Sequence, residues 1–171
     1  MQRHCICGIA AAALLGAVLA TAGADGARKR KPEPPIRGVS VPVSVTVKTD
    51  KAVYTSDAPI HITLTVKNPS RSAVRLPFSS GQKYDIEIRR GKGLNGERVW
   101  QWAKGRVFTE MLTQATVAPG KSLTFQETFA PNDKTAEGVA PLAPGTYTVV
   151  GILTTSGRAP RPSGGTVITV K

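Results

Sequence analysis

Cysteine and histidine are almost absent from this sequence. Its 171 residues include two cysteines and two histidines, namely Cys5, Cys7, His4 and His61. Beyond residue 24 only His61 remains, which excludes cysteine nucleophiles, disulfides and Cys/His zinc sites from that part of the chain. A Ser-His-Asp arrangement would need His61, but the alternation of its neighbours places it on the polar face of a strand. We therefore expect no enzymatic activity, no catalytic residue, no metal site and no cofactor.

Long apolar runs are also absent, except near the start. No residue between Cys5 and Ala20 is charged, and the small residues Ala22 and Ala24 follow in the A-x-A pattern of a secretory signal peptide. The run is shorter than the roughly 20 residues that a membrane-spanning helix needs. We therefore expect residues 1–24 to be a signal peptide and the protein to be exported to the periplasm, cell envelope or exterior. Retention of the segment as an uncleaved anchor is the alternative; after cleavage no transmembrane segment is expected.

Acidic residues are few. Eleven acidic residues stand against 23 basic ones, giving a formal charge of +12. Part of the excess lies in residues 25–38, where Pro-rich sequence follows a run of four cations, Arg28, Lys29, Arg30 and Lys31. Like charges and prolines favour an extended linker, which could tether the protein to an anionic envelope polymer. A solvated basic surface is the simpler interpretation, and nucleic acid is not an expected partner of an exported protein.

The remaining residues, 39–171, form one domain by length and consist of short alternating runs. Apolar and polar residues alternate with the period of two that puts one set on each face of a strand. We find no sustained helical period, and residues 106–114 predict one helical turn or an irregular loop. Asn95-Gly96 indicates a hairpin. The sequence predicts an all-β, immunoglobulin-like antiparallel sandwich of seven to nine strands. The expected strands include residues 41–47, 60–66, 74–78, 84–89, 99–102, 123–129, 146–154 and 166–170.

Four side chains in these runs carry specific expectations. Glu127 shares the phase of its apolar neighbours, so it either points inward and pairs with Arg106, Lys104 or backbone N–H groups, or lies at a bulge or edge that releases it to solvent. Trp100 and Trp102 lie on one face, either in the core or as an exposed pair that grips a partner. Tyr147 follows Pro144-Gly145 where a tyrosine corner would lie.

Several blocks of sequence together resemble the BsuPI-type intracellular proteinase inhibitor family. The resemblance spans about residues 60–154, and its blocks are residues 78–85, 99–102, 105–109, 117–123, 125–129 and 142–149. It implies an immunoglobulin-like sandwich and inhibition of a serine proteinase. One departure is that the family name describes an intracellular protein, whereas this chain begins with an export-like segment.

We therefore expect an exported, non-enzymatic β-sandwich that binds a protein partner, with a serine proteinase as the candidate target. One candidate binding loop, residues 77–83, contains Ser79, Ser80, Gly81 and Gln82. The other, residues 157–165, offers Arg158 and Arg161 to a trypsin-like pocket. The alternative is a cell-envelope binding or accessory module without inhibitory activity.

Overall fold

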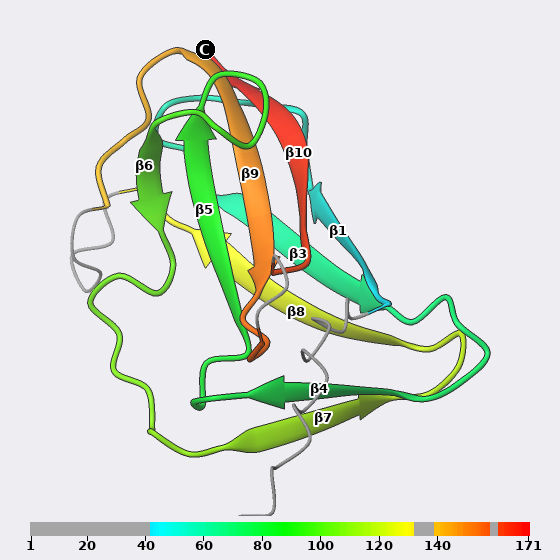
Figure 1. The fold of residues 1–171 in the computed structure, drawn as a ribbon. Helices are drawn as coiled ribbons and strands as arrows, with labels where there is room; N and C mark the ends of the chain where they lie inside the picture. Colours follow the sequence, from blue (N-terminus) through cyan, green and yellow to red (C-terminus); the bar gives the residue numbers. More distant parts are fainter. Residues whose placement is uncertain (1–41, 132–138, 158–160) are drawn as a thin grey trace, which may run out of the picture. The chain divides into compact units, whose positions relative to one another are not determined.

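The structure is a computed structural model that describes residues 42–131, 139–157 and 161–171, all within one compact unit (Figure 1). The described residues form ten β-strands and no helix. The strands are β1 (Ser44–Thr49), β2 (Val53–Tyr54), β3 (Ile60–Lys67), β4 (Val74–Phe78), β5 (Tyr84–Arg90), β6 (Arg98–Gln101), β7 (Thr113–Val117), β8 (Ser122–Phe129), β9 (Gly145–Leu153) and β10 (Ser163–Val170). Within these ranges, no helix is long and apolar enough to cross a membrane.

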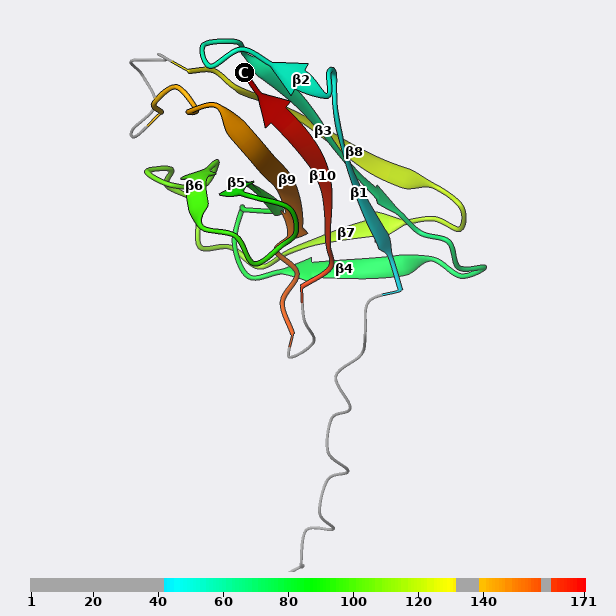
Figure 2. The ribbon, with the colours of Figure 1, turned by 90° about the horizontal axis from the view of Figure 1, so that it is seen from above.

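The strands form two facing layers and a short ribbon. One layer has the order β1-β3-β8, the second has the order β2-β10-β9-β5-β6, and β4 pairs with β7. Figure 2 shows the first layer facing the second. Every pairing is antiparallel except that of β2 with β10, which is parallel. The predicted all-β sandwich is confirmed, with ten strands in place of the expected seven to nine.

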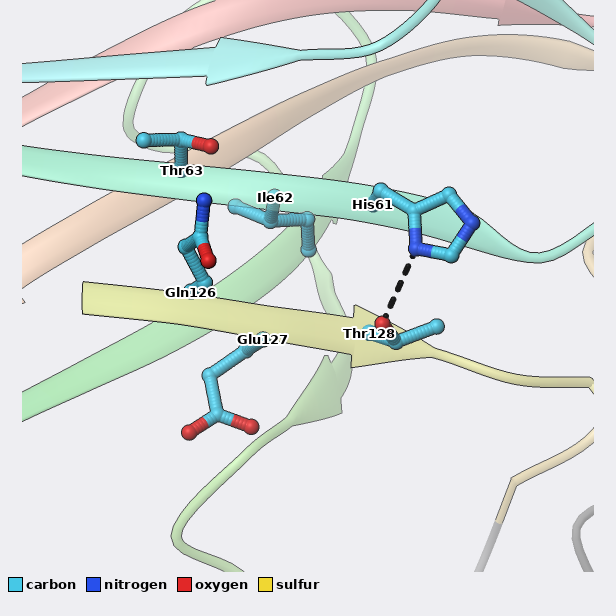
Figure 3. A pocket seen from close by; sticks show the side chains of 6 residues that line it. All are labelled: His61, Ile62, Thr63, Gln126, Glu127 and Thr128. Atoms are coloured by element: carbon cyan, nitrogen blue, oxygen red, sulfur yellow. Dashed lines mark hydrogen bonds between the residues drawn. The ribbon is translucent and has the colours of Figure 1, made fainter.

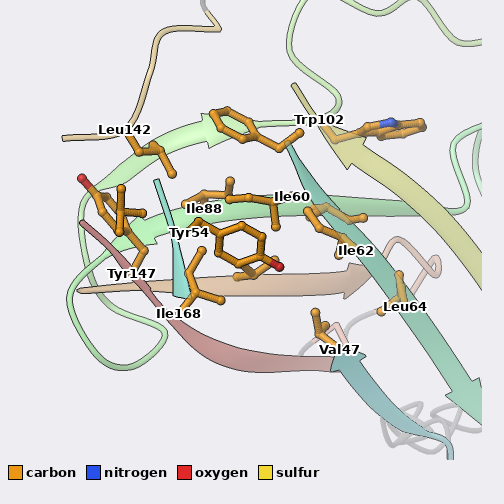
Figure 4. Close-up of a cluster of buried hydrophobic side chains, with 14 residues drawn as sticks. Val47, Tyr54, Ile60, Ile62, Leu64, Ile88, Trp102, Leu142, Tyr147 and Ile168 are labelled. Atoms are coloured by element: carbon orange, nitrogen blue, oxygen red, sulfur yellow. The ribbon is translucent and has the colours of Figure 1, made fainter. Parts of the chain in front are cut away.

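The alternation in the sequence creates the core between the layers. On β3, Ile60, Ile62, Leu64 and Val66 are all buried, while His61 on the opposite face is exposed. They belong, with residues of β5 and β9, to the clusters of buried apolar side chains drawn in part in Figure 4. Each fully buried aliphatic side chain contributes about 1.5–3 kcal/mol relative to its exposed state. These side chains are therefore the main stabilising component of the sandwich.

One glycine allows the layers to approach closely. A Cβ atom on Gly151 of β9 would lie 2.4 Å from Leu64 Cδ1 and 2.7 Å from Val47 Cγ2. Such distances are far shorter than an ordinary van der Waals contact, so a larger residue would push β9 away from β1 and β3. The glycine therefore sets the spacing of the two layers at this point.

The strands differ from the sequence-based expectations at several points. β2 and β7 were not expected, β1 is Ser44–Thr49 instead of residues 41–47, and β10 begins at Ser163 instead of residue 166. Gly164 and Gly165 pair with Gly151 and Val150 of β9, so residues 163–165 of the expected 157–165 loop belong to a strand. The hairpin predicted from Asn95-Gly96 is present as β5 and β6, but its connection spans residues 91–97. Pairing partners far along the chain cause these differences, and local sequence does not reveal them.

The tyrosine corner expected at Tyr147 is confirmed. Its ring is fully buried in the core, and its hydroxyl donates a 2.7 Å hydrogen bond to the carbonyl oxygen of Ala143. This bond satisfies the one polar atom of a buried side chain and fixes the chain where it enters β9.

Candidate partner-binding site

Four of the six sequence blocks that carry the family resemblance, residues 78–85, 99–102, 105–109 and 125–129, meet at one edge of the sandwich. Asp85 of β5 joins two of them. Its Oδ1 accepts hydrogen bonds from the N–H groups of Ile86 (2.9 Å) and Ala103 (3.1 Å), and its Oδ2 accepts one from Gln101 Nε2 (2.5 Å). The carboxylate is buried, so these partners offset the cost of removing it from water. Asp85 thereby fixes the turn that follows β6 against β5.

Aromatic rings support the segment that leaves this turn. Trp102 stacks on Tyr84 with ring centroids 4.6 Å apart, and Tyr84 stacks on Phe125 of β8 at 4.4 Å. Phe108 packs against Trp102, with ring centroids 5.8 Å apart. The Arg106 guanidinium lies 4.3 Å from the Trp102 ring centroid, within cation–π range. Residues 103–108 are therefore docked on the sandwich by two of their own side chains.

Glu127 lies behind these rings and takes neither of the expected roles. The β3–β8 ladder continues without a bulge past Glu127, which keeps it in the inward phase, and the described residues provide it with no ion pair. Its Oε1 accepts a 2.5 Å hydrogen bond from the Tyr84 hydroxyl. Burial, and then this hydrogen bond and the negative charge of Glu127, raise the pKa of Tyr84 well above its usual range, against a smaller opposing effect of Arg106. The expectations of solvent release or an ion pair were wrong because the nearest partner is a neutral phenol.

The Ser79–Gln82 loop, singled out from the sequence, lies against the same segment. The Gly81 N–H donates a 2.8 Å hydrogen bond to the Thr109 carbonyl oxygen. A Cβ atom on Gly81 would lie 2.7 Å from Thr109 Oγ1, so glycine permits this close approach. On the other side, Thr154 Oγ1 donates to the Gln82 carbonyl (2.7 Å). The loop is therefore held from two directions, with Ser79 exposed and Ser80, Gly81 and Gln82 half-buried.

The other residues predicted to bind a partner are dispersed. Trp102 is buried and Trp100 is half-buried with its ring edge-on to Phe129, so both support the surface from the core side. Arg161 is exposed just before β10. Outside the described residues are Arg158, the signal segment 1–24, and the proposed tether of Arg28, Lys29, Arg30 and Lys31.

Sequence reasoning missed three exposed apolar side chains in the segment between β6 and β7. Val107 is 98% exposed, Met111 60% and Leu112 84%. The only signal in the sequence was that residues 106–114 contain apolar residues without the alternation of a strand. Exposure of the three could not be derived from this, because it depends on which neighbours cover them.

His61 lines a shallow polar groove on the opposite face of β3 and β8 (Figure 3). Its Nδ1 lies 3.1 Å from Thr128 Oγ1, while Glu127 extends to the other side of β8. The residues that line the groove include His61 and Glu127 but no serine, so they do not provide the Ser-His-Asp arrangement of nucleophilic catalysis. Within the described ranges, no three His, Cys, Asp or Glu side chains gather in a way that could hold a metal ion.

Among solved structures, similarity is low. A β-glucosidase from Erythrobacter marinus is 15% identical, with a TM-score of 0.44 over 75% of this chain and 15% of its own. The sporulation control protein Spo0M from Bacillus subtilis is 20% identical, with a TM-score of 0.45 over 75% of this chain and 49% of its own. The CARDB domain of a Pyrococcus furiosus protein, in complex with di-metal ions, is 13% identical, with a TM-score of 0.38 over 75% and 87%. No curated protein matches the chain.

A family model described as "Intracellular proteinase inhibitor" matches residues 47–158. This description contradicts the expected export and points to the cytoplasm. The expectation of export was based on the apolar run of residues 1–24, which lies outside the described residues. Because the match covers more than half of the sequence and most of the sandwich, the chain belongs to the BsuPI family of intracellular proteinase inhibitors.

Proposed function

We propose that this protein is a non-enzymatic inhibitor that binds a serine proteinase through the edge formed by residues 79–83 and 103–112. Membership in an inhibitor family supports a proteinase as the partner. The observation that carries the choice of surface is the hydrogen bond between Gly81 N–H and the Thr109 carbonyl oxygen, which joins the two exposed segments. An inhibitor of this kind presents to the proteinase a segment that already has its bound conformation.

Preorganisation explains how such a surface would inhibit. A flexible segment loses conformational entropy when it enters a proteinase cleft, and this loss weakens binding. Here Phe108 and Arg106 pack against Trp102 and Thr109 is bonded to Gly81, so much of that loss has occurred on folding. After cleavage of a peptide bond, the same contacts would hold the two ends together and favour resealing over release.

Three carboxylates near this edge, those of Asp85, Glu87 and Glu127, support a binding role over a catalytic one. Asp85 is saturated by backbone and amide donors, and Glu127 is bonded to Tyr84. Glu87 forms ion pairs with Arg89 and Arg98, at 2.5 and 3.1 Å. Each of these groups is occupied in holding the fold, so none is free to act as a general acid or base.

The proposal is tested by titrating the full-length chain into fixed amounts of trypsin, chymotrypsin and elastase and measuring residual activity. We expect at least one enzyme to lose activity in proportion to added chain, reaching completion near one equivalent. Heat-unfolded chain serves as the control and should not inhibit. Steady cleavage of the chain as an ordinary substrate, with no loss of activity in any of the enzymes, would contradict the proposal and favour an accessory binding role.

A further inference from the structure

Among the residues that the structure describes, the most exposed large apolar side chains are concentrated in one segment. Val107, Met111 and Leu112 are exposed within six residues of one another, at 98%, 60% and 84%. The other large exposed apolar side chains in the described part of the chain, Val53, Leu94 and Val167, are separate from one another in sequence and are 45–47% exposed. Scattered exposure of this second kind is ordinary on a protein surface, whereas a cluster indicates a site of interaction.

The exposure of this cluster is not a consequence of a loose chain. At its start, Arg106 and Phe108 pack against the Trp102 ring. At its end, Thr113 pairs with Phe78 at the beginning of the β4–β7 ladder. Between them, Thr109 is bonded to Gly81. The segment is therefore fixed at both ends and in the middle, and its apolar side chains are held in water by a rigid frame.

A bend at Glu110 presents two of these side chains. The Thr109 carbonyl oxygen accepts hydrogen bonds from both Gly81 N–H (2.8 Å) and Met111 N–H (3.0 Å). The second bond closes a tight turn over Glu110, after which Met111 and Leu112 lead into β7. Leu112 is the more exposed of the two and is unbranched at Cβ, a shape that enters a narrow pocket easily.

We propose that residues 107–112 are the reactive segment of the inhibitor and that Leu112 fills the primary specificity pocket of a serine proteinase whose pocket is apolar. This inference rests on the proposed function and names the segment and target class for that surface. A large neutral side chain suits the hydrophobic slot of a chymotrypsin-like enzyme, whereas a trypsin-like pocket contains a carboxylate that requires a cation. It replaces the expectation that Arg158 or Arg161 enters a trypsin-like pocket.

The test uses substitutions of Leu112 in the full-length chain, assayed against chymotrypsin and trypsin. Leu112→Asp should weaken chymotrypsin inhibition by about 30-fold or more, the effect of removing a central interface residue. Leu112→Arg should lose chymotrypsin inhibition and gain stoichiometric inhibition of trypsin, a gain that misfolding cannot produce. Leu94→Asp is the matched control, because Leu94 is also an exposed leucine in a connection, and it should inhibit as the unsubstituted chain does.

The outcomes separate this inference from the proposed function. If the chain inhibits chymotrypsin but Leu112→Asp is as potent and Leu112→Arg gains nothing against trypsin, the reactive segment lies elsewhere and only this inference fails. If the unsubstituted chain inhibits trypsin but not chymotrypsin, this inference also fails while the proposed function stands. If no serine proteinase is inhibited, the proposed function itself fails. A dimer of the unsubstituted chain that Leu112→Asp converts to a monomer, seen by size-exclusion chromatography with light scattering, would assign the segment to self-association and overturn the inference.

Discussion

At the scale of single residues, Tyr84 connects the sandwich to the proposed binding edge. Its ring lies between Trp102 and Phe125, and its hydroxyl is bonded to Glu127 on the opposite layer. Alternation in the sequence puts Tyr84 and Glu127 in phase with the apolar residues of their strands, and leaves open whether Glu127 points inward or is released to solvent. It could not predict that they meet, because they are 43 positions apart and belong to different sheets.

This contact gives stability a dependence on alkaline pH. The pKa of Tyr84 in the folded protein lies above that of an unfolded tyrosine, about 10, so folding favours the protonated phenol. Its contribution is complete below pH 10 and is lost as the pH rises through the folded-state pKa. We therefore expect the free energy of unfolding to fall more steeply above pH 10 in the unsubstituted chain than in Tyr84→Phe. Urea denaturation of both proteins from pH 8 to 11 would show this, and parallel curves would contradict it.

At the scale of elements, the ribbon of β4 and β7 continues the β3–β8 ladder after a reversal at Asn68. The Asn68 N–H donates to the Lys121 carbonyl, and the Gly120 N–H donates to the Asn68 carbonyl. The segment that follows β3 and the segment that precedes β8 therefore stay paired through the bend. The Asn68 side chain is buried. Its Nδ2 donates to the carbonyl oxygens of Ser72 (2.8 Å), Val117 (2.9 Å) and Ala118 (3.3 Å), and its Oδ1 accepts from Ser70.

Replacing Asn68 should therefore lower the stability of the folded protein. Asn68→Ala leaves buried carbonyl groups without donors, and we expect the free energy of unfolding to fall by about 2–3 kcal/mol. Ser70→Ala is the control, since it removes the hydroxyl bonds of a half-buried side chain at the same turn and should cost about 1 kcal/mol or less. Chemical denaturation measures both changes, and an Asn68→Ala protein no less stable than Ser70→Ala would show that the bend does not depend on this amide.

Some elements could be predicted from the sequence and others could not, for a physical reason. β3, β4, β8 and β9 have apolar residues on the face that becomes buried, so their pattern suffices. β7 has one buried residue, Val117, and becomes a strand through pairing with β4. β5 is buried on both faces, because its outward Asp85 and Glu87 are covered by side chains from β6. Such cover depends on tertiary pairing, as does the exposure of Leu112.

At the scale of the whole sandwich, three segments far apart in the sequence meet at one edge. Residues 79–83 contact Thr109 on one side and Thr154 on the other, and Ser156 N–H donates to the Pro77 carbonyl. The edge is therefore a rigid unit whose shape is set by the core behind it. Membership in the inhibitor family, to which the sequence blocks correctly pointed, implies a proteinase partner, and we propose that the partner binds this edge; the compartment inferred from residues 1–24 was wrong.

Hydrogen–deuterium exchange of the full-length chain, alone and with one equivalent of a serine proteinase that it inhibits, tests this account most directly. Binding through the proposed edge should slow amide exchange in residues 79–83 and 106–112. Exchange in β1 and in β10, which belong to other parts of the sandwich, should be unchanged. Slowing confined to residues outside the edge, with 79–83 and 106–112 exchanging as in the free protein, would contradict the account.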